Sequence, residues 1–253
     1  MKIITDEKEI VKMALDDKKI HKKPSITITA LAKHYHNMGM DKPQIKKEIQ
    51  YFMSQNYRYF NLVKWQKIID SYVNKYANDG HELLQVKNIC ITKAELEVIS
   101  SLKNLKQEKI LFVLLVYAKI FNQINPNNNN WTNSEDKDIF SDAKLTVKIK
   151  DQRLTLHKLF QTGLISMAKK VNSTNICVNF INENSDVVIV LDDFRNFVLE
   201  YLKYKGDNIE YCSKCGDRFM VTGKVHNYCK QCAKEIQFNQ KKEWDRNSRI
   251  RNS

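Results

Sequence analysis

The stretch CSKCGDRFMVTGKVHNYCKQC, residues 212–232, decides the fold of the C-terminal part of the chain. It contains two Cys-x2-Cys pairs, Cys212 with Cys215 and Cys229 with Cys232, which are thirteen residues apart. Each two-residue spacer lets a tight turn direct both sulfur atoms at one ion, and four thiolates complete a tetrahedral shell. The spacing therefore predicts one structural Zn2+ bound by these four cysteines.

Three other uses of paired cysteines are less consistent with the sequence. Disulfides need an oxidising compartment, and Met1-Lys2-Ile3-Ile4 leads into acidic residues instead of an apolar signal core. A thioredoxin-type redox pair needs a βαβ context that is missing here. An iron centre of the rubredoxin type has similar ligand spacing and stays an alternative. With every coordination position filled by protein, the metal would stabilise the fold and not catalyse.

The residues around the cysteines predict a treble-clef-like finger over residues 206–253. Gly216 suits the positive φ that is common just after a zinc knuckle. Between the pairs, the segment 219–225 with Gly223 predicts a short hairpin, and a helix is expected from about Lys230 toward Arg249. The second cysteine pair would then lie on the first turn of this helix.

The segment after the last cysteine is strongly basic and is the first candidate nucleic-acid contact. On a continuous helix its lysines gather near one side, where they can contact phosphate or a groove, and Trp244 can stack a base. The candidate residues are Lys234, Lys241, Lys242, Arg246 and Arg249. The alternative is a solvated terminal helix without a ligand.

Upstream, residues 91–205 predict a winged-helix-like domain. Thr92 and Glu95 form a capping-box pattern, and the apolar stretch 105–124 predicts a buried central helix. A short helix after Ser134 and another from about residue 150 to Gln161 follow, then a break at Gly163. Strands are expected around residues 164–167, 176–180 and 187–191, and Asp192-Asp193 is expected to cap a helix through Tyr204, packed by Phe194, Phe197, Val198 and Tyr201.

The helix that ends at Gln161 is the second candidate nucleic-acid contact. We expect Gln152 and His157 to be exposed on it beside three basic residues, with two more in the wing. The candidate residues are Lys150, Arg153, Lys158, Lys169 and Lys170. Winged helices also serve as protein-binding or structural modules, and the near-neutral charge of residues 131–202 keeps that alternative open.

Residues 1–90 predict a helical domain with a possible helix-turn-helix. A helix over residues 28–36 breaks at Asn37-Met38-Gly39, and Asp41 caps the next one. After the aromatic segment 57–60, apolar residues keep helical spacing from Trp65 to Tyr76. We interpret these aromatic residues as core and not as base-stacking platforms, because they keep this period.

Composition agrees with a mainly α protein with small β elements. The 253 residues include 42 Lys and Arg against 29 Asp and Glu, a net charge of +13, but just six Gly and three Pro. The longest apolar run, residues 110–118, is too short to cross a bilayer, so no membrane association is expected. Phosphate-loop, dinucleotide-binding and nucleophile-elbow motifs are missing, so we do not expect an enzyme.

The segment from Asp192 through Gly206 and on into both cysteine pairs resembles uncharacterised zinc-finger proteins from prophages and mobile elements of Gram-positive bacteria. The similarity extends upstream through the winged-helix-like part, although the cysteine motif alone is specific. This resemblance implies a phage setting and a zinc-bearing accessory protein. Because the chain starts without an apolar signal core, we expect it in the cytoplasm, here that of a bacterial host. The resemblance supplies no activity.

Two functions follow from these observations. The first is a regulatory or replicative nucleic-acid-binding protein, with DNA preferred over RNA, whose helical and winged parts add specificity or a homodimer surface. The second is a phage-encoded interaction protein that inhibits a host defence complex, such as a CRISPR effector, and so binds a host nucleoprotein. A nuclease or modifying enzyme is a third and the least favoured alternative.

Overall fold

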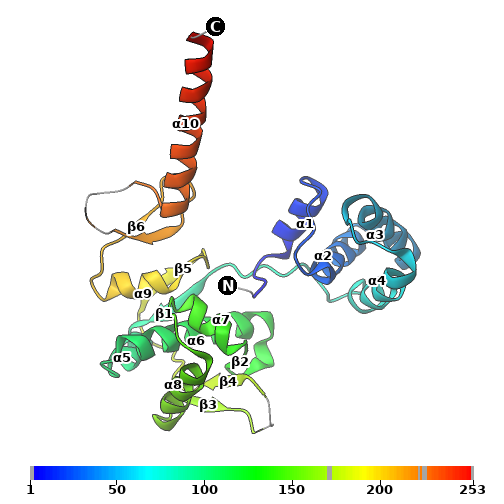
Figure 1. Cartoon of the computed structure of the whole chain (residues 1–253). Coiled ribbons are helices and arrows are strands. Elements are labelled where there is room, and N and C mark those ends of the chain that lie inside the picture. The colour runs from blue at the N-terminus through cyan, green and yellow to red at the C-terminus, as the bar shows by residue number, and fades with distance from the viewer. Residues whose placement is uncertain (1–2, 170–172, 222, 224–226, 252–253) are drawn as a thin grey trace. The chain divides into compact units, whose positions relative to one another are not determined.

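The protein is described by a computed structural model. The residues that it describes are 3–169, 173–221, 223 and 227–251, apart from the side chains of residues 248–251. Their contacts divide the chain into two compact units, one from Ile3 to Val86 and one that begins at Lys87. The second unit holds both the middle region and the cysteine-rich segment, and each unit is described by itself (Figure 1).

The first unit is a group of helices around an apolar core. They are α1 (Glu7–Leu15), α2 (Pro24–Asn37), α3 (Lys42–Asn56) and α4 (Leu62–Tyr76). The predicted break after α2 is present, since Gly39 has a φ of +84°. Asp41 caps α3 by accepting a hydrogen bond from the Gln44 amide at 2.8 Å. The periodic residues bury as predicted, with Ile45, Ile49 and Ile69 fully inside.

A central helix, α6 (Leu105–Ile124), organises the second unit. Every residue from Ile110 to Ala118 is buried, as the apolar sequence predicts. A helix that is apolar on all sides must be covered on all sides. The elements in contact with it include α5 (Lys93–Ser100), α7 (Asp136–Asp142), α9 (Val198–Tyr204), β1 (Ile89–Thr92), β2 (Trp131–Asn133) and β4 (Asn175–Val178).

The predicted capping box opens α5 and is part of a buried ion pair. The Thr92 amide donates to Glu95 Oε2 at 2.9 Å, and the Glu95 amide donates to Thr92 Oγ1 at 3.4 Å. Glu95 is fully buried and lies 2.9 Å from Lys119 Nζ of α6, so the cap also fixes α5 to the central helix. Just before α5, β1 pairs antiparallel with β5 (Val187–Leu191).

The middle of this unit is a three-stranded antiparallel sheet beside two helices. After α6 come a 3-10 turn (Pro126–Asn128), β2, α7, α8 (Ile149–Gln161), β3 (Ile165–Met167) and β4. The strand order is β2-β4-β3, so β4 lies in the centre. Gly163 ends α8 with a φ of +76°, as expected. The sequence did not predict β2, because its three residues gain a partner only through Cys177 and its neighbours far along the chain.

The segment before α9 differs from the prediction. Asp193 does not cap a long helix; instead its carboxylate accepts hydrogen bonds from the Arg195 amide at 2.8 Å and from the Arg195 guanidinium. This local turn, with Asn196 at a φ of +46°, delays the start of α9 to Val198. Phe197 and Tyr201 nevertheless pack against the core as predicted.

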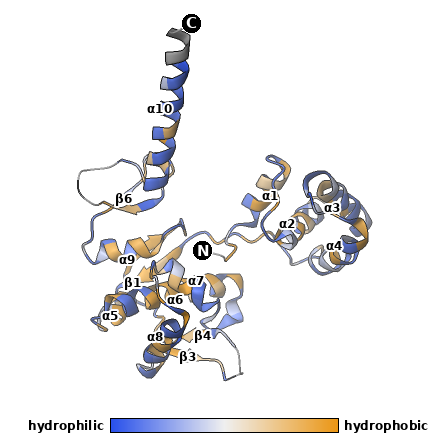
Figure 2. Cartoon of the chain, in the orientation of Figure 1, coloured by the Kyte–Doolittle hydropathy of each residue, from blue (hydrophilic) through white to orange (hydrophobic). Residues whose placement is uncertain are grey.

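The last part of the chain contains a hairpin and a long helix. β6 (Ile209–Tyr211) pairs antiparallel with β7 (Arg218–Met220), so the first cysteine pair lies in the turn between them. The expected hairpin over residues 219–225 is therefore corrected, since β7 pairs with an earlier strand; residues 222 and 224–226 lie outside the described residues. α10 (Lys230–Arg251) follows and is mostly hydrophilic (Figure 2).

No helix in the described parts of the chain has both the length and the apolar character needed to cross a membrane.

Candidate metal centre and basic surfaces

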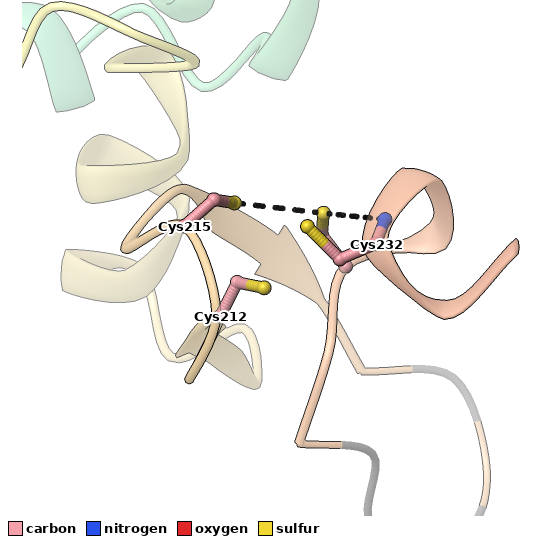
Figure 3. A group of neighbouring side chains, drawn as sticks. Cys212, Cys215 and Cys232 are labelled. Atoms are coloured by element: carbon pink, nitrogen blue, oxygen red, sulfur yellow. Dashed lines mark hydrogen bonds between the residues drawn. The ribbon is translucent and has the colours of Figure 1, made fainter. Parts of the chain in front are cut away.

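Four cysteine sulfur atoms meet at one point of the second unit. Cys212 and Cys215 come from the turn between β6 and β7, Cys229 precedes α10, and Cys232 lies in its first turn. The four sulfur atoms all lie within 4.8 Å of one another. Figure 3 shows Cys212 and Cys215 on one side and Cys232 at the start of the helix on the other, with their sulfur atoms pointing toward one another.

Backbone hydrogen bonds shape both cysteine turns. The Gly216 amide donates to the Cys212 carbonyl at 2.8 Å, and Gly216 takes a φ of +72° that favours glycine. In the second turn the Cys232 amide points at Cys229 Sγ at 3.5 Å. A further bond, from the Ser213 amide to the Asn227 carbonyl at 2.9 Å, joins the two turns directly.

The spacing of the sulfur atoms fits a tetrahedral ion. Metal–sulfur bonds of ~2.3 Å place neighbouring ligands of a tetrahedron about 3.8 Å apart. Cys215 Sγ and Cys229 Sγ, which come from different turns, are 3.8 Å apart. Cys212 and Cys232 are buried, and Cys215 and Cys229 are half-buried. The four cysteines therefore form a candidate metal site without a position left open for substrate.

The electrostatics of the thiols point to the same chemistry. Burial opposes ionisation of Cys212, but hydrogen bonds from the backbone of Cys229, Cys215 and Lys214 outweigh it and lower the pKa of its thiol to about 6. Burial raises the pKa of the Cys232 thiol to about 12, and the neighbouring sulfur atoms add to the increase. Without a metal, the protein therefore favours the thiolate of Cys212 and opposes that of Cys232. A divalent cation would be needed to ionise all four thiols.

A buried arginine fixes the hairpin that carries the first cysteine pair to the helix before it. Arg218 of β7 is 4% exposed, and its guanidinium bonds the Glu200 carboxylate of α9. The same guanidinium donates to the Asp193 carbonyl at 2.9 Å and to the Arg195 carbonyl at 3.1 Å. Tyr211 of β6 donates to Glu200 at 2.6 Å, and this hydrogen bond raises the pKa of the tyrosine hydroxyl.

Two further contacts reach the cysteine turn itself. Arg195 Nη2 donates to the Cys215 carbonyl at 2.9 Å, and Asn196 Nδ2 donates to Asp217 Oδ2 at 2.6 Å. The turn that delays α9 therefore supports the first cysteine pair. Sequence reasoning missed this role, although the residues 192–196 stand just upstream of the motif; long-range contacts of this kind leave no local pattern.

The candidate contacts on α10 are exposed. Lys234, Lys241, Lys242 and Arg246 all face solvent, as do Phe238 at 58% and Trp244 at 70% exposure. Lys242 Nζ lies 4.6 Å from the centroid of the Phe238 ring. The backbone of Arg249 belongs to α10, while its side chain lies outside the described residues.

The candidate contacts on α8 are also exposed, with one correction. Lys150, Arg153, His157 and Lys158 face solvent, and Lys169 does so after β3. Gln152 was expected to be exposed. It is buried instead, because its amide donates to the Val147 carbonyl at 2.9 Å and closes the turn before α8. Lys170 lies outside the described residues.

Among the aromatic residues that the sequence analysis interpreted as core, Tyr59 does not belong to the core. Tyr59, in the connection from α3 to α4, is 71% exposed, whereas Trp65 and Tyr76 are partly buried against the core as predicted. Helical period covers residues of α4 but not the connection before it, and this is why sequence reasoning misplaced Tyr59. The sequence does offer one indication that Tyr59 is exposed, because the charged Arg58 stands directly before it.

The chain matches no protein-family model, no curated protein and no solved structure. Its function therefore has to be argued from the chemistry of the cysteine cluster and the exposed basic helices. The resemblance to zinc-finger proteins of prophages and mobile elements stays a prediction.

Proposed function

We propose that the protein is a non-enzymatic, zinc-containing nucleic-acid-binding protein, and that its ligand is DNA. The main support for this proposal is the exposed positive charge of α10. Its sequence holds seven Lys or Arg and three Asp or Glu, and every residue from Gln237 to Asn247 is exposed. The cysteine cluster fixes the start of this helix, so a concentrated positive charge is held on a defined scaffold.

Zinc is the proposed metal because four cysteine thiolates in a tetrahedral arrangement are a common structural zinc shell. The 3.8 Å separation of Cys215 and Cys229 fits this shell. When bound, the ion would hold the two turns of a treble-clef-like finger together. Protein would occupy all four positions, which supports a structural and not a catalytic role.

A polyanion is a better partner for α10 than a second copy of the helix. Coiled-coil pairing needs apolar residues that repeat along one face. Seven residues after Ile236 stands Glu243, and seven residues before Trp244 stands Gln237, so neither apolar residue is repeated at the adjacent heptad position of α10. A helix that packs against little else is only marginally stable in water. Contacts between its basic side chains and phosphates would stabilise it further.

A winged-helix arrangement of α6 to β4 is part of the proposal. The order is helix, strand, two helices and two strands, with β4 central, and it places α8 before the β3–β4 connection. Lys150, Arg153 and His157 lie three and four residues apart, so they share the exposed side of α8 while Leu156 and Leu159 bury the other. This is the disposition expected of a recognition helix.

Removing charge from α10 tests the proposal. The triple variant Lys241→Ala, Lys242→Ala, Arg246→Ala should weaken duplex DNA binding on unrelated sequences alike. Its salt dependence should flatten by about one unit of slope for each phosphate that the helix no longer neutralises. Fluorescence anisotropy at several salt concentrations measures both quantities.

The matched control is Gln237→Ala, Asn239→Ala, Gln240→Ala, which changes equally exposed but uncharged residues of the same helix. It should bind DNA as the wild type does. An unchanged slope in the charged triple variant would disprove the role of α10.

A second candidate function is binding to a protein of a host nucleoprotein complex. One observation favours it: α8 also exposes Ile149 at 71% and Leu154 at 53%. Leu154 borders a cavity of about 680 Å3, together with His157 and Met167, which could take an apolar side chain of a partner. Co-purification of one host protein that survives nuclease treatment would favour this function.

A further inference from the structure

The connection between α3 and α4, together with the first turn of α4, presents aromatic and aliphatic side chains to solvent. We call it the Tyr59 surface; it comprises residues 57–64. Tyr59 is 71% exposed, Leu62 50% and Val63 84%, and the three are close in sequence. Exposed aromatic and aliphatic side chains that gather in this way commonly mark an interaction site. Residues 57–61 form the link between the helices α3 and α4 that are labelled in Figure 1, and residues 62–64 form the first turn of α4.

Packing holds the Tyr59 ring in place although most of it faces solvent. The half-buried Trp65 contacts Tyr57 edge to face, with ring centroids 5.4 Å apart. Tyr57 in turn contacts Tyr59 edge to face at 5.9 Å. The Arg58 guanidinium carbon lies 5.8 Å from the centroid of the Tyr59 ring. Tyr59 is thus braced through a row of rings that ends on the core, so little ordering is needed before it stacks on a ligand.

In the sequence on both sides of this ring, the charged side chains are all basic. Between Glu48 and Asp70 the sequence contains no acidic residue, while Arg58, Lys64 and Lys67 are all exposed. Asp70 at the end of this stretch lies 3.0 Å from Lys46 Nζ, so its charge is already compensated. A ligand of this surface is therefore expected to carry negative charge.

We propose that the Tyr59 surface binds single-stranded nucleic acid. An unpaired base stacks on Tyr59, and Arg58 and Lys64 contact the adjoining phosphates. The exposed ring of Tyr59 can stack on a base, and the basic side chains of Arg58 and Lys64 can pair with phosphates, which are the two groups that alternate along a single strand. In a duplex the base faces are already stacked, so Tyr59 would find no partner there. The inference rests on the proposed nucleic-acid function and adds a second, chemically different contact in the other unit.

The test compares a labelled 20-nucleotide oligothymidylate with a 20-base-pair duplex, both titrated with the metal-loaded full chain by fluorescence anisotropy. Tyr59→Ala should weaken oligothymidylate binding about five- to hundredfold, the range expected when one base stack is removed. Its duplex affinity should stay within about twofold of the wild type. Tyr59→Phe keeps the ring and should bind both ligands normally. Met38→Ala removes a side chain of the same unit that is 66% exposed and serves as the matched control.

Photo-crosslinking gives a second measurement that does not depend on affinity. An oligothymidylate with 5-iodouracil substitutions should crosslink to Tyr59 in the wild type. Crosslinks confined to α10 would overturn the inference, as would a Tyr59→Ala variant that binds oligothymidylate as tightly as the wild type.

The two proposals fail separately. If the wild type binds the duplex while Tyr59→Ala leaves oligothymidylate binding unchanged, the Tyr59 surface is disproved and the proposed function stands. If Tyr59→Ala weakens oligothymidylate binding while the charged triple variant of α10 leaves duplex binding unchanged, the inference stands and the role of α10 is disproved.

Discussion

Arg218 and Glu200 show how single residues tie the cysteine cluster to the rest of its unit. The side chains of this ion pair are 3% and 11% exposed, so neither charge is solvated by bulk water. Removal of one partner from a buried pair leaves the other charge without compensation, which typically costs about 3–5 kcal/mol. By contrast, the exposed pair of Lys214 and Glu235, 2.9 Å apart, is expected to contribute under about 1 kcal/mol.

Arg218→Met should therefore destabilise the second unit by about 3–5 kcal/mol, because Glu200 stays buried opposite an apolar chain. The measurement is urea unfolding of the metal-loaded protein. Lys214→Met is the control and should change the free energy of unfolding by less than about 1 kcal/mol. Adding Glu200→Gln to Arg218→Met should recover part of the stability. A change below about 1 kcal/mol in Arg218→Met would show that the ion pair does not stabilise the unit.

At the scale of elements, α8 carries two kinds of exposed side chain, and each suits a different function. Lys150 and Arg153 suit a phosphate backbone, whereas Ile149 and Leu154 suit an apolar surface of a protein. The four residues stand within six positions of one helix. Replacing the two basic residues or the two apolar residues therefore alters different chemistry at nearly the same place on the protein.

Lys150→Ala with Arg153→Ala should weaken duplex binding and flatten its salt dependence by about two units of slope if both side chains contact phosphate. Ile149→Gln with Leu154→Gln should leave duplex binding within about twofold of the wild type, because these side chains carry no charge. Anisotropy titrations of both variants measure the difference. The opposite pattern, with duplex binding abolished only in the apolar pair, would contradict a phosphate-contacting α8.

The elements differ in how far sequence could predict them. Asp41 and Thr92 predict the starts of α3 and α5 correctly, because a cap is a contact over three residues. β2 could not be predicted, since Trp131 pairs with Cys177 far along the chain and a strand of three residues is too short to show an alternating pattern. The start of α9 was misplaced because Asp193 bonds Arg195 instead of a helix amide. Contacts between residues close in sequence could thus be predicted, but the sequence did not show which of several local or distant partners a residue binds.

The candidate site follows the same rule. Regular spacing identified Cys212, Cys215, Cys229 and Cys232, and the structure brings their sulfur atoms together. The support from Arg218 and the exposure of Tyr59 depend on tertiary packing, which spacing does not encode.

For the whole molecule, the net charge of +13 is less informative than its location. In the second unit the positive charge is concentrated on α10, whose start contains Cys232. In the first unit the stretch between Glu48 and Asp70 is free of acidic residues and contains the exposed Tyr59. We therefore propose duplex contacts for the second unit and single-strand contacts for the first unit. The proposed metal supports the duplex contacts, because it would fix the start of α10.

In the proposed function, a zinc-bound cysteine cluster makes α10 a DNA-binding helix. This claim is tested most directly by the duplex affinity of the full chain before metal removal, after removal under reducing conditions, and after zinc is restored. We predict about one zinc per chain, a decrease in duplex affinity of about tenfold or more in the metal-free protein as the finger unfolds, and recovery with zinc. Metal-free protein that binds duplex DNA with an unchanged Kd and salt slope would contradict this claim.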